Sequence, residues 1–293
     1  MTYPKPQSGF TLVEIIIVIA IMGIIGGLAS MVIGRSLDAY AALERRTNMQ
    51  TSIRLAVERI SRELRHALPN SICVNNGVSC VADAQNRFYF IPVKDSGRYQ
   101  DRPGVYYPGQ TRDRLGVAPQ SRNRFDVLST NNTNRINAAV GINGDWVAVY
   151  NLDNSTVYPA GNNIRHQINA IIQKDIHNTP GNTNDDIDQI QFSGNVSFTN
   201  HSPSRRFHII DNQKQVTLFY LNGTNLFRDT TTFSNPNTAT GNSRLLMENV
   251  QACTFTYTPG SQQRAGLLRI DITVAEQGET IQVIHDAHVY NTP

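Results

Sequence analysis

The stretch GFTLVEIIIVIAIMGIIGGLASMVI, residues 9–33, decides the fold of the N-terminal part of the chain. From Phe10 to Ile33 it runs for 24 residues, and Glu14 is the one charged residue among them. At about 1.5 Å per residue, a helix of this length spans roughly 36 Å, enough to cross the hydrocarbon core of a bilayer. We therefore predict a transmembrane helix over residues 10–34.

The segment before this helix, residues 1–9 (MTYPKPQSG), is short and polar and ends in a small residue. An ordinary secretory signal has its small-residue cleavage site after the apolar core. Here Gly9 precedes the apolar core, so a cut after Gly9 would remove a leader and leave the hydrophobic helix attached to the mature protein. We expect residues 1–9 to be such a leader.

Beyond the apolar stretch, residues 35–68 keep a helical pattern but become amphipathic. Apolar residues recur every three or four positions, as on one buried face of a helix: Ile53, Val57, Ile60, Leu64 and Leu68. Charged residues spaced four apart occupy the other faces, and Pro69 ends the pattern. We predict that the helix continues to Leu68 and packs under a domain of the same chain.

Residues 69–293 have the pattern of a β-rich head. Short apolar runs predict strands, among them 87–93, 146–152, 189–192, 216–221, 226–228, 253–258, 267–274 and 280–289. Asn222-Gly223, Pro259-Gly260 and Gln277-Gly278 predict turns. Residues 94–144 and 155–186 look like long surface loops, apart from a short helix or strand at 164–172. The predicted fold is α+β, a long N-terminal helix packed on a β-rich globular head.

Composition limits the classes of function. A formal charge of +3 over 293 residues does not indicate nucleic-acid binding on electrostatic grounds. The three cysteines, Cys73, Cys80 and Cys253, suggest one disulfide and one spare thiol in an exported domain. All three pairings are open, with a slight preference for Cys80–Cys253, because Cys80 precedes a predicted strand and Cys253 begins another.

The residues Gly9-Phe10-Thr11-Leu12-Val13-Glu14 resemble the G-F-T-L-x-E signature of type IV prepilins and type II secretion pseudopilins. The resemblance implies cleavage after Gly9 by a prepilin peptidase and N-methylation of Phe10. It also implies other major and minor pilins and an inner-membrane assembly platform as partners, with a periplasmic head. Several runs of the head, such as VTLFYL at 216–221 and GLLRIDITV at 266–274, resemble minor pilins of the W and J type, including those of the mannose-sensitive haemagglutinin (MSHA) pilus.

Glu14 lies five residues into the membrane helix, where insertion of a carboxylate costs about 2.5–3.5 kcal/mol, and less near the interface. An ionisable residue at this depth needs a partner. In the resembled family the glutamate pairs with the N-terminal amine of a neighbouring subunit, and we expect this assembly role for Glu14. The alternative is a glutamate close enough to the headgroups to stay hydrated.

Small residues recur at four-residue spacing along the same helix: Gly23 with Gly27, and Gly26 with Ser30 and Gly34. Such rows allow close helix–helix approach in lipid. Because glycine costs about 1 kcal/mol relative to alanine in a helix, they equally suit a stretch of weak helicity. The sequence leaves both interpretations open.

Other chemical motifs have weaker support. His285-Asp286-Ala287-His288 suits a surface strand better than a metal cluster, because neighbouring side chains point to opposite faces. The alternation Asn182, Asn184, Asp186, Asp188 resembles a calcium loop, but Ile187 and Ser193 occupy the positions of its glycine and its final acidic residue. We find no catalytic motif and expect neither enzymatic activity nor a cofactor or metal.

Three functions remain in competition. The first is a structural minor pilin that primes the filament or lies at its tip. The second is a tip adhesin or DNA receptor, which would use the loops around 94–144 and 155–186. A DNA-binding patch would lie in the basic and tyrosine-bearing residues of 94–126. We expect no nucleic-acid partner, because mixed charge in loops usually serves solubility. The third is a minor pseudopilin of a type II secretion system.

Overall fold

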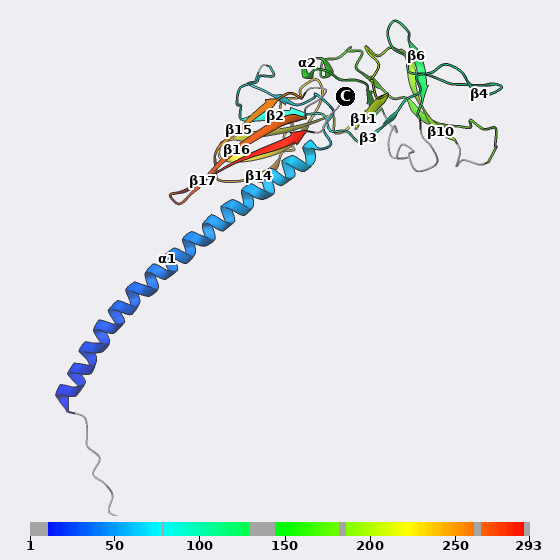
Figure 1. Ribbon diagram of the computed structural model, residues 1–293. Coiled ribbons are helices and arrows are strands. Elements are labelled where there is room, and N and C mark those ends of the chain that lie inside the picture. The colour runs from blue at the N-terminus through cyan, green and yellow to red at the C-terminus, as the bar shows by residue number, and fades with distance from the viewer. Residues whose placement is uncertain (1–10, 78, 129–143, 182–185, 261–264, 290–293) are drawn as a thin grey trace, which may run out of the picture. The chain divides into compact units, whose positions relative to one another are not determined.

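The computed structural model describes residues 11–77, 79–128, 144–181, 186–260 and 265–289 (Figure 1). The chain divides into two compact units, residues 1–51 and residues 52–293. One helix, α1 (Leu12–Leu64), begins in the first unit and ends in the second. In the remainder of the second unit, the described helices and strands are all strands apart from one four-residue helix, which confirms an α+β fold with a long apolar N-terminal helix and a β-rich head.

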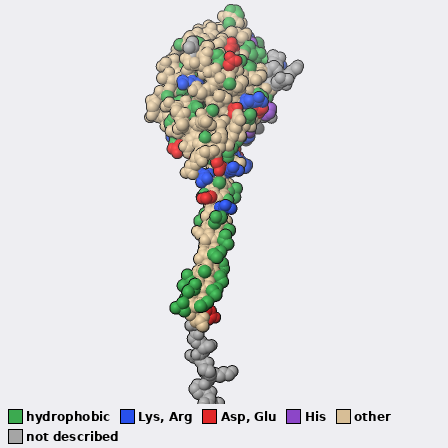
Figure 2. Space-filling view, turned by 90° about the vertical axis from the view of Figure 1, so that its left-hand side faces the viewer, with side chains coloured by type: hydrophobic (Ala, Val, Ile, Leu, Met, Phe, Trp, Pro, Cys, Tyr) green, Lys and Arg blue, Asp and Glu red, His purple; other side chains and the backbone are tan. Residues whose placement is uncertain are grey.

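In the first unit, α1 carries apolar side chains around its whole circumference. The large apolar side chains from Leu12 to Ile33 have exposed fractions between 43 % and 76 %. Figure 2 shows them covering this part of the helix, with one acidic side chain at its N-terminal end and the other charged side chains farther along. This helix is long and apolar enough to cross a membrane, and it is the one such helix in the described part of the chain. Residues 12–33 alone span roughly 33 Å at about 1.5 Å per residue.

In the second unit, the last turns of α1 bury the predicted apolar stripe. Ile53, Val57, Ile60 and Leu64 are all buried. On the same turns, Glu63 accepts hydrogen bonds from Arg228 Nε at 3.0 and 3.1 Å, and Ser61 Oγ lies 3.3 Å from His285 Nε2. Since Arg228 and His285 lie on different sheets, these contacts place residues 52–64 across both.

The helix ends at Leu64, four residues before the predicted end. After the turn at residues 65–66, the backbone pairs with the chain that follows β2: Leu68 N donates to Ile91 O, and Val93 N donates to His66 O, both at 2.7 Å. Leu68 is buried as predicted, but it reaches the core as extended chain rather than as the next helical turn. The sequence pattern cannot distinguish the two, because one more apolar residue at the right spacing fits either conformation.

Two antiparallel sheets lie beside the end of α1 (Figure 1). The first has the order β1-β2-β12-β13-β14, with β1 (Cys73–Val74), β2 (Arg87–Phe90), β12 (Val216–Asn222), β13 (Asn225–Thr231) and β14 (Arg244–Met247). The second has the order β15-β16-β17, with β15 (Val250–Thr258), β16 (Gly266–Glu276) and β17 (Glu279–Val289). A bridge between Gln85 and Phe255 links the two through a pair of backbone hydrogen bonds of 3.0 and 2.7 Å.

The other strands form two sheets and a hairpin. One sheet has the order β6-β10-β9, with β6 (Arg122–Asp126), β10 (Ile187–Val196) and β9 (Ala170–Lys174). The other has the order β3-β11-β7-β8, with β3 (Asp95–Arg98), β11 (Arg206–Ile210), β7 (Trp146–Ala148) and β8 (Arg165–Gln167). The hairpin joins β4 (Val105–Tyr107) to β5 (Gln110–Thr111), and a short helix, α2 (Asn154–Val157), follows β7.

The predicted hairpin at Asn222-Gly223 and the predicted turn at Gln277-Gly278 are both present, the first with a shifted turn. Glu276 pairs with Glu279, so Gln277 and Gly278 form the predicted two-residue turn, both with positive φ. Asn222, however, pairs with Asn225, so the turn that joins β12 to β13 is Gly223-Thr224 rather than Asn222-Gly223. Gly223 has φ +59° at the first turn position, a conformation that glycine adopts without strain.

Two clusters of buried side chains among the described residues lie on either side of the sheet β3-β11-β7-β8. Val147 and Ile209 from that sheet enter one cluster, together with Tyr99, Phe125 and other residues of the segment around β6, β9 and β10. Alternating residues of the same strands enter the other cluster, which backs the sheet β1-β2-β12-β13-β14. The alternation of side chains along a strand lets this sheet contribute to both cores.

The prediction of long surface loops at 94–144 and 155–186 is wrong for much of their described part. Tyr99 and Phe125 are fully buried and their rings meet edge to face. The strands here have only two to five residues, and apolar residues alternate with arginine, asparagine and aspartate, so the segments look polar on average. The predicted element at 164–172 is present as β8 and β9. Residues 129–143 and 182–185 lie outside the described residues.

The preferred disulfide is also wrong: Cys73 pairs with Cys80, and Cys253 is a buried free thiol. A bridge between Asn75 and Cys80 turns the chain back on itself and brings the Cα atoms of the two cysteines to 5.1 Å. Cys73 packs in the core with Tyr89. On β15, Cys253 shares a face with Phe255, whose ring contacts Phe88 of β2. Phe88 and Tyr89 are neighbours along β2, so their side chains lie on opposite faces of the sheet. The sheet therefore separates Cys253 from the other two cysteines.

Candidate functional site

The first candidate site is the N-terminal end of α1, where Thr11 and Glu14 cap the helix reciprocally. Glu14 N donates to Thr11 Oγ1 at 3.3 Å, and Thr11 N donates to Glu14 Oε2 at 3.4 Å. This arrangement is a capping box, which satisfies two backbone N–H groups that the helix cannot bond itself. The spacing Thr11-x-x-Glu14 in the sequence is a signal for this contact, which neither the predicted pairing with a neighbouring subunit nor the hydrated alternative includes.

The capping contact leaves Glu14 capacity for a second partner. An ionised carboxylate offers about four acceptor sites, and the single contact of 3.4 Å occupies one of them, weakly. Glu14 is exposed and has Leu12, Val13, Ile15 and Ile16, all exposed, as sequence neighbours. It thus combines a carboxylate with an apolar surface, a combination that suits an ammonium partner in a medium of low dielectric constant. Gly9 and Phe10 lie outside the described residues.

The glycines of the apolar helix do not serve packing within the chain. A Cβ atom built at Gly23, Gly26, Gly27 or Gly34 would meet nothing within 4 Å. The helix is nevertheless continuous through all four positions. Their surface is therefore available to a neighbouring helix, and the two interpretations of these residues, close approach and weak helicity, stay predictions.

The histidine-rich end of β17 forms ion pairs and hydrogen bonds rather than a cluster of metal ligands. Asp286 accepts from Arg269 Nε and Nη2 at 2.8 and 3.0 Å, and this hydrogen bond lowers the pKa of Asp286. His285 lies against Ser61. Within the described residues, no group of three His, Cys, Asp or Glu side chains could hold a metal ion. Asn182 and Asn184 of the calcium-like alternation lie outside these residues, and Asp188 is buried on β10.

The basic residues of 94–126 are partly neutralised within the fold. Lys94 Nζ contacts Asp145 Oδ2 at 2.9 Å, and Arg124 contacts Asp113 at 3.4 Å. The guanidinium of Arg112 lies over the ring of Tyr106. The positions of these three residues therefore do not support a continuous basic surface that could bind nucleic acid.

A second candidate site is a pocket in the head beside β8, lined by Trp146, Arg165 and Phe233 among others. None of these three residues is predicted from the sequence to be functional. The nearest sequence signal, the predicted short helix or strand at 164–172, concerns secondary structure and not a binding site. The pocket forms because Trp146, Arg165 and Phe233 come from three segments distant in sequence, and such a convergence leaves no local motif.

Comparison with known proteins gives one family match. The prokaryotic N-terminal methylation motif matches residues 4–30. No curated protein and no solved structure matches the chain. The matched residues include the Gly9–Glu14 signature and most of the apolar stretch, but none of the head.

This motif, joined to the long apolar helix, supports a type IV pilin-like protein of the pilin and pseudopilin class. It implies processing by prepilin peptidase, methylation, and assembly with other pilins. The apolar helix supports membrane anchoring with a globular head. The matched motif is that of a structural class of protein and indicates no enzymatic domain.

Proposed function

We propose that this chain is a minor pilin of an MSHA-like type IV pilus, which helps to prime the filament or lies at its tip. The observation that carries the proposal is the prepilin-type signature at Gly9–Glu14, followed directly by an exposed apolar helix and a β-rich head. The finer assignment rests on the resemblance of the head to minor pilins of the W and J type. Within these, the chain length and the ending HVYNTP resemble MshO of the MSHA pilus.

The proposal divides the chain into four parts. Residues 1–9 are the leader and residues 10–34 the transmembrane helix, anchored in the inner membrane. Residues 35–64 continue the helix as its amphipathic part, and the head follows in the periplasm. The disulfide between Cys73 and Cys80 supports an oxidising compartment for the head.

In this proposal Glu14 has two successive roles. In the free subunit it caps its own helix through Thr11, by the long contacts described above. Cleavage after Gly9 creates a cationic amine at Phe10, and the Glu14 carboxylate of one subunit pairs with the amine of its neighbour. At an effective dielectric constant of 20, two unit charges 4 Å apart attract by about 4 kcal/mol, before desolvation is subtracted. This pairing would favour docking only after processing.

The test compares Glu14→Gln with Glu44→Gln, which removes a carboxylate from the same helix at a polar position. Both variants are expressed in the native host, and the chain is measured in sheared filaments and in membranes. Glu14→Gln should be lost from the filament fraction and remain in the membrane, because its amide carries no charge to attract the amine. Glu44→Gln should distribute like the unsubstituted chain. Equal incorporation of the two variants would contradict the role of Glu14.

A secretion pseudopilin remains the alternative class. A pseudopilin has the same N-terminal chemistry but acts on exported enzymes. The Glu14→Gln variant therefore cannot distinguish a pseudopilin from a pilus subunit. Cross-linking of the chain in membranes of the native host does: a pilus subunit should be captured with a major pilin, and a pseudopilin with components of the secretion system. A tip adhesin or DNA receptor would use the head, and binding to the head tests it directly.

A further inference from the structure

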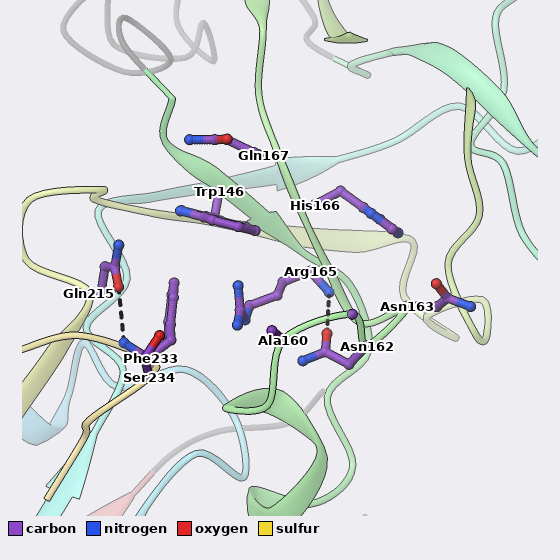
Figure 3. A pocket seen from close by; sticks show the side chains of 11 residues that line it. Trp146, Ala160, Asn162, Asn163, Arg165, His166, Gln167, Gln215, Phe233 and Ser234 are labelled. Atoms are coloured by element: carbon purple, nitrogen blue, oxygen red, sulfur yellow. Dashed lines mark hydrogen bonds between the residues drawn. The ribbon is translucent and has the colours of Figure 1, made fainter. Parts of the chain in front are cut away.

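The pocket beside β8 has a volume of about 360 Å³ and a lining without acidic residues (Figure 3). Ligand pockets in proteins have volumes of about 300–1,000 Å³, so this one would suit a ligand of one or two small rings. Besides Arg165 and the two aromatic side chains, its lining consists mainly of amides, a serine and a histidine. The surface therefore offers many hydrogen-bonding groups and one full positive charge.

That charge belongs to Arg165, which two aromatic rings hold in place. Its guanidinium carbon lies 3.9 Å from the ring centroid of Phe233 and 4.5 Å from that of Trp146, and the two rings meet edge to face beside it (Figure 3). Nε donates to Val157 O at 2.9 Å, and Nη2 donates to Tyr158 O at 3.0 Å and more weakly to Pro159 O. The side chain is thus fixed before any ligand binds, which reduces the entropy lost on binding.

The charge of Arg165 has no counter-charge in the described part of the chain. The residue is 6 % exposed, and its guanidinium forms no ion pair with a described carboxylate. Nη1 donates no hydrogen bond to a described residue, and Arg165 lines the pocket, so two N–H groups are available to a ligand. Burial without a compensating anion lowers the pKa of Arg165 to about 10. A buried cation is unfavourable unless it is paired, and an anion in the pocket would supply the pair.

A purely structural role for Arg165 explains only part of this arrangement. Holding the carbonyl groups at the end of α2 uses Nε and Nη2, which a neutral amide could do in part without burying a charge. It does not explain the neutral polar rim of the pocket. On that rim, the exposed side chains of Asn163 and Ser234 form no hydrogen bond with the rest of the described chain.

We propose that this pocket binds a small hydroxylated carboxylate of the sugar-acid class. The carboxylate accepts from Nη1 of Arg165, since guanidinium and carboxylate form strong charge-assisted hydrogen bonds. The hydroxyl groups bond to Asn163 and Ser234, and a ring C–H face lies against the partly exposed ring of Trp146. A monoanion fits better than a phosphate dianion, because Arg165 is the one cationic arginine or lysine among the lining residues. The inference does not depend on the filament to which the chain belongs.

Trp146 makes the site directly measurable, because it is the single tryptophan of the chain. The probe is sodium glucuronate, titrated against the full-length chain in detergent micelles while tryptophan emission is recorded. Glucose and sodium acetate serve as the neutral sugar and the bare carboxylate. We expect a saturable change with glucuronate and weaker affinity for both comparison compounds. Glucose lacks the carboxylate and should bind at least roughly tenfold more weakly, the ratio for one charge-assisted hydrogen bond, whereas acetate lacks the hydroxyl groups and the ring.

The decisive variant is Asn163→Asp, which has nearly the shape of the original side chain and adds a negative charge at the rim. It should weaken glucuronate binding on the order of fivefold, as expected for like charges in a partly solvated site. Asn169→Asp is the matched control: Asn169 is exposed and lies outside the pocket, so affinity should be unchanged. Both variants leave the contacts of Arg165 intact, so folding is preserved and is checked by circular dichroism.

Three results would overturn the proposal. The first is no saturable change in emission below about 10 mM glucuronate, a limit that corresponds to binding too weak for a built site. The second is glucose binding as tightly as glucuronate, which would remove the role of the carboxylate. The third is equal affinity in Asn163→Asp and in the unsubstituted chain, which would place the binding elsewhere.

Discussion

Truncation of Ile60 to alanine tests whether the last turns of α1 are an integral part of the head. Ile60 is 0 % exposed, so the change removes three buried carbon atoms, at about 0.8 kcal/mol each for the transfer alone. The remaining cavity raises the loss of unfolding free energy, and the better helix propensity of alanine offsets about 0.4 kcal/mol. We expect Ile60→Ala to lower the free energy of unfolding by about 2–4 kcal/mol.

Leu55→Ala is the matched control on the same helix, because Leu55 is 62 % exposed. It should change the free energy of unfolding by less than about 0.5 kcal/mol. Urea titration of the full-length chain in detergent, followed by emission of Trp146 in the head, measures both variants. If both variants unfolded within about 0.5 kcal/mol of each other, helix packing would not support the head and the reasoning would be refuted.

Three further predictions concern the head. Arg228→Gln removes a partly buried ion pair with Glu63 and should lower the free energy of unfolding, measured by urea titration, by about 1–2 kcal/mol. Arg54→Gln removes an exposed ion pair and should leave this free energy unchanged, so equal shifts in the two variants would contradict the prediction. A thiol reagent should modify one thiol per chain, that of Cys253, and only after unfolding, because burial raises the pKa of this thiol to about 12. Modification of the folded protein would contradict this prediction. Burial lowers the pKa of His208 to about 4, so between pH 6.5 and about 4 the unfolded state binds more protons than the folded state. The free energy of unfolding should therefore fall as the pH is lowered through this range. An equally steep fall in the variant His208→Asn would refute His208 as the cause.

The sequence predicted the elements that depend on local composition. The apolar helix follows from an uninterrupted run without proline, and the β16–β17 hairpin follows from Gln277-Gly278, where glycine favours the turn conformation. Both signals arise within a few residues along the chain. The tertiary environment did not overrule either of them.

The elements that failed depend on contacts between distant residues. Arg122–Asp126 looks like a polar loop, but Phe125 is fully buried because strands β9 and β10 and the aromatic cluster close over it. A strand of five residues with one apolar side chain in the core has too little periodicity to be recognised. The same holds for the segment around Tyr99.

The cysteine pairing failed for a related reason. The preference for Cys80–Cys253 rested on two predicted strands, one that follows Cys80 and one that begins at Cys253. The face of the sheet on which each cysteine lies decides the outcome, and it depends on the pairing of β1 with β2 and on the contact of Phe255 with Phe88. Neither contact can be inferred from spacing alone.

The candidate sites differ in the same way. The signature Gly9–Glu14 is contiguous, so the sequence carried it completely, although the capping contact of Glu14 with Thr11 became apparent only from the helix geometry. The pocket around Arg165 draws its side chains from β7, β8 and the segment after β13. Its unpaired charge is recognisable only once the neighbours of Arg165 are known.

The most direct test of the central claim is the mass of the N-terminal peptide of the chain, isolated from membranes and from sheared filaments of the native host. The proposal predicts a peptide that begins at Phe10 and carries one additional methyl group, present in both fractions. A peptide that still begins at Met1, or one produced by a cut after the apolar run, would contradict processing as a type IV pilin-like subunit.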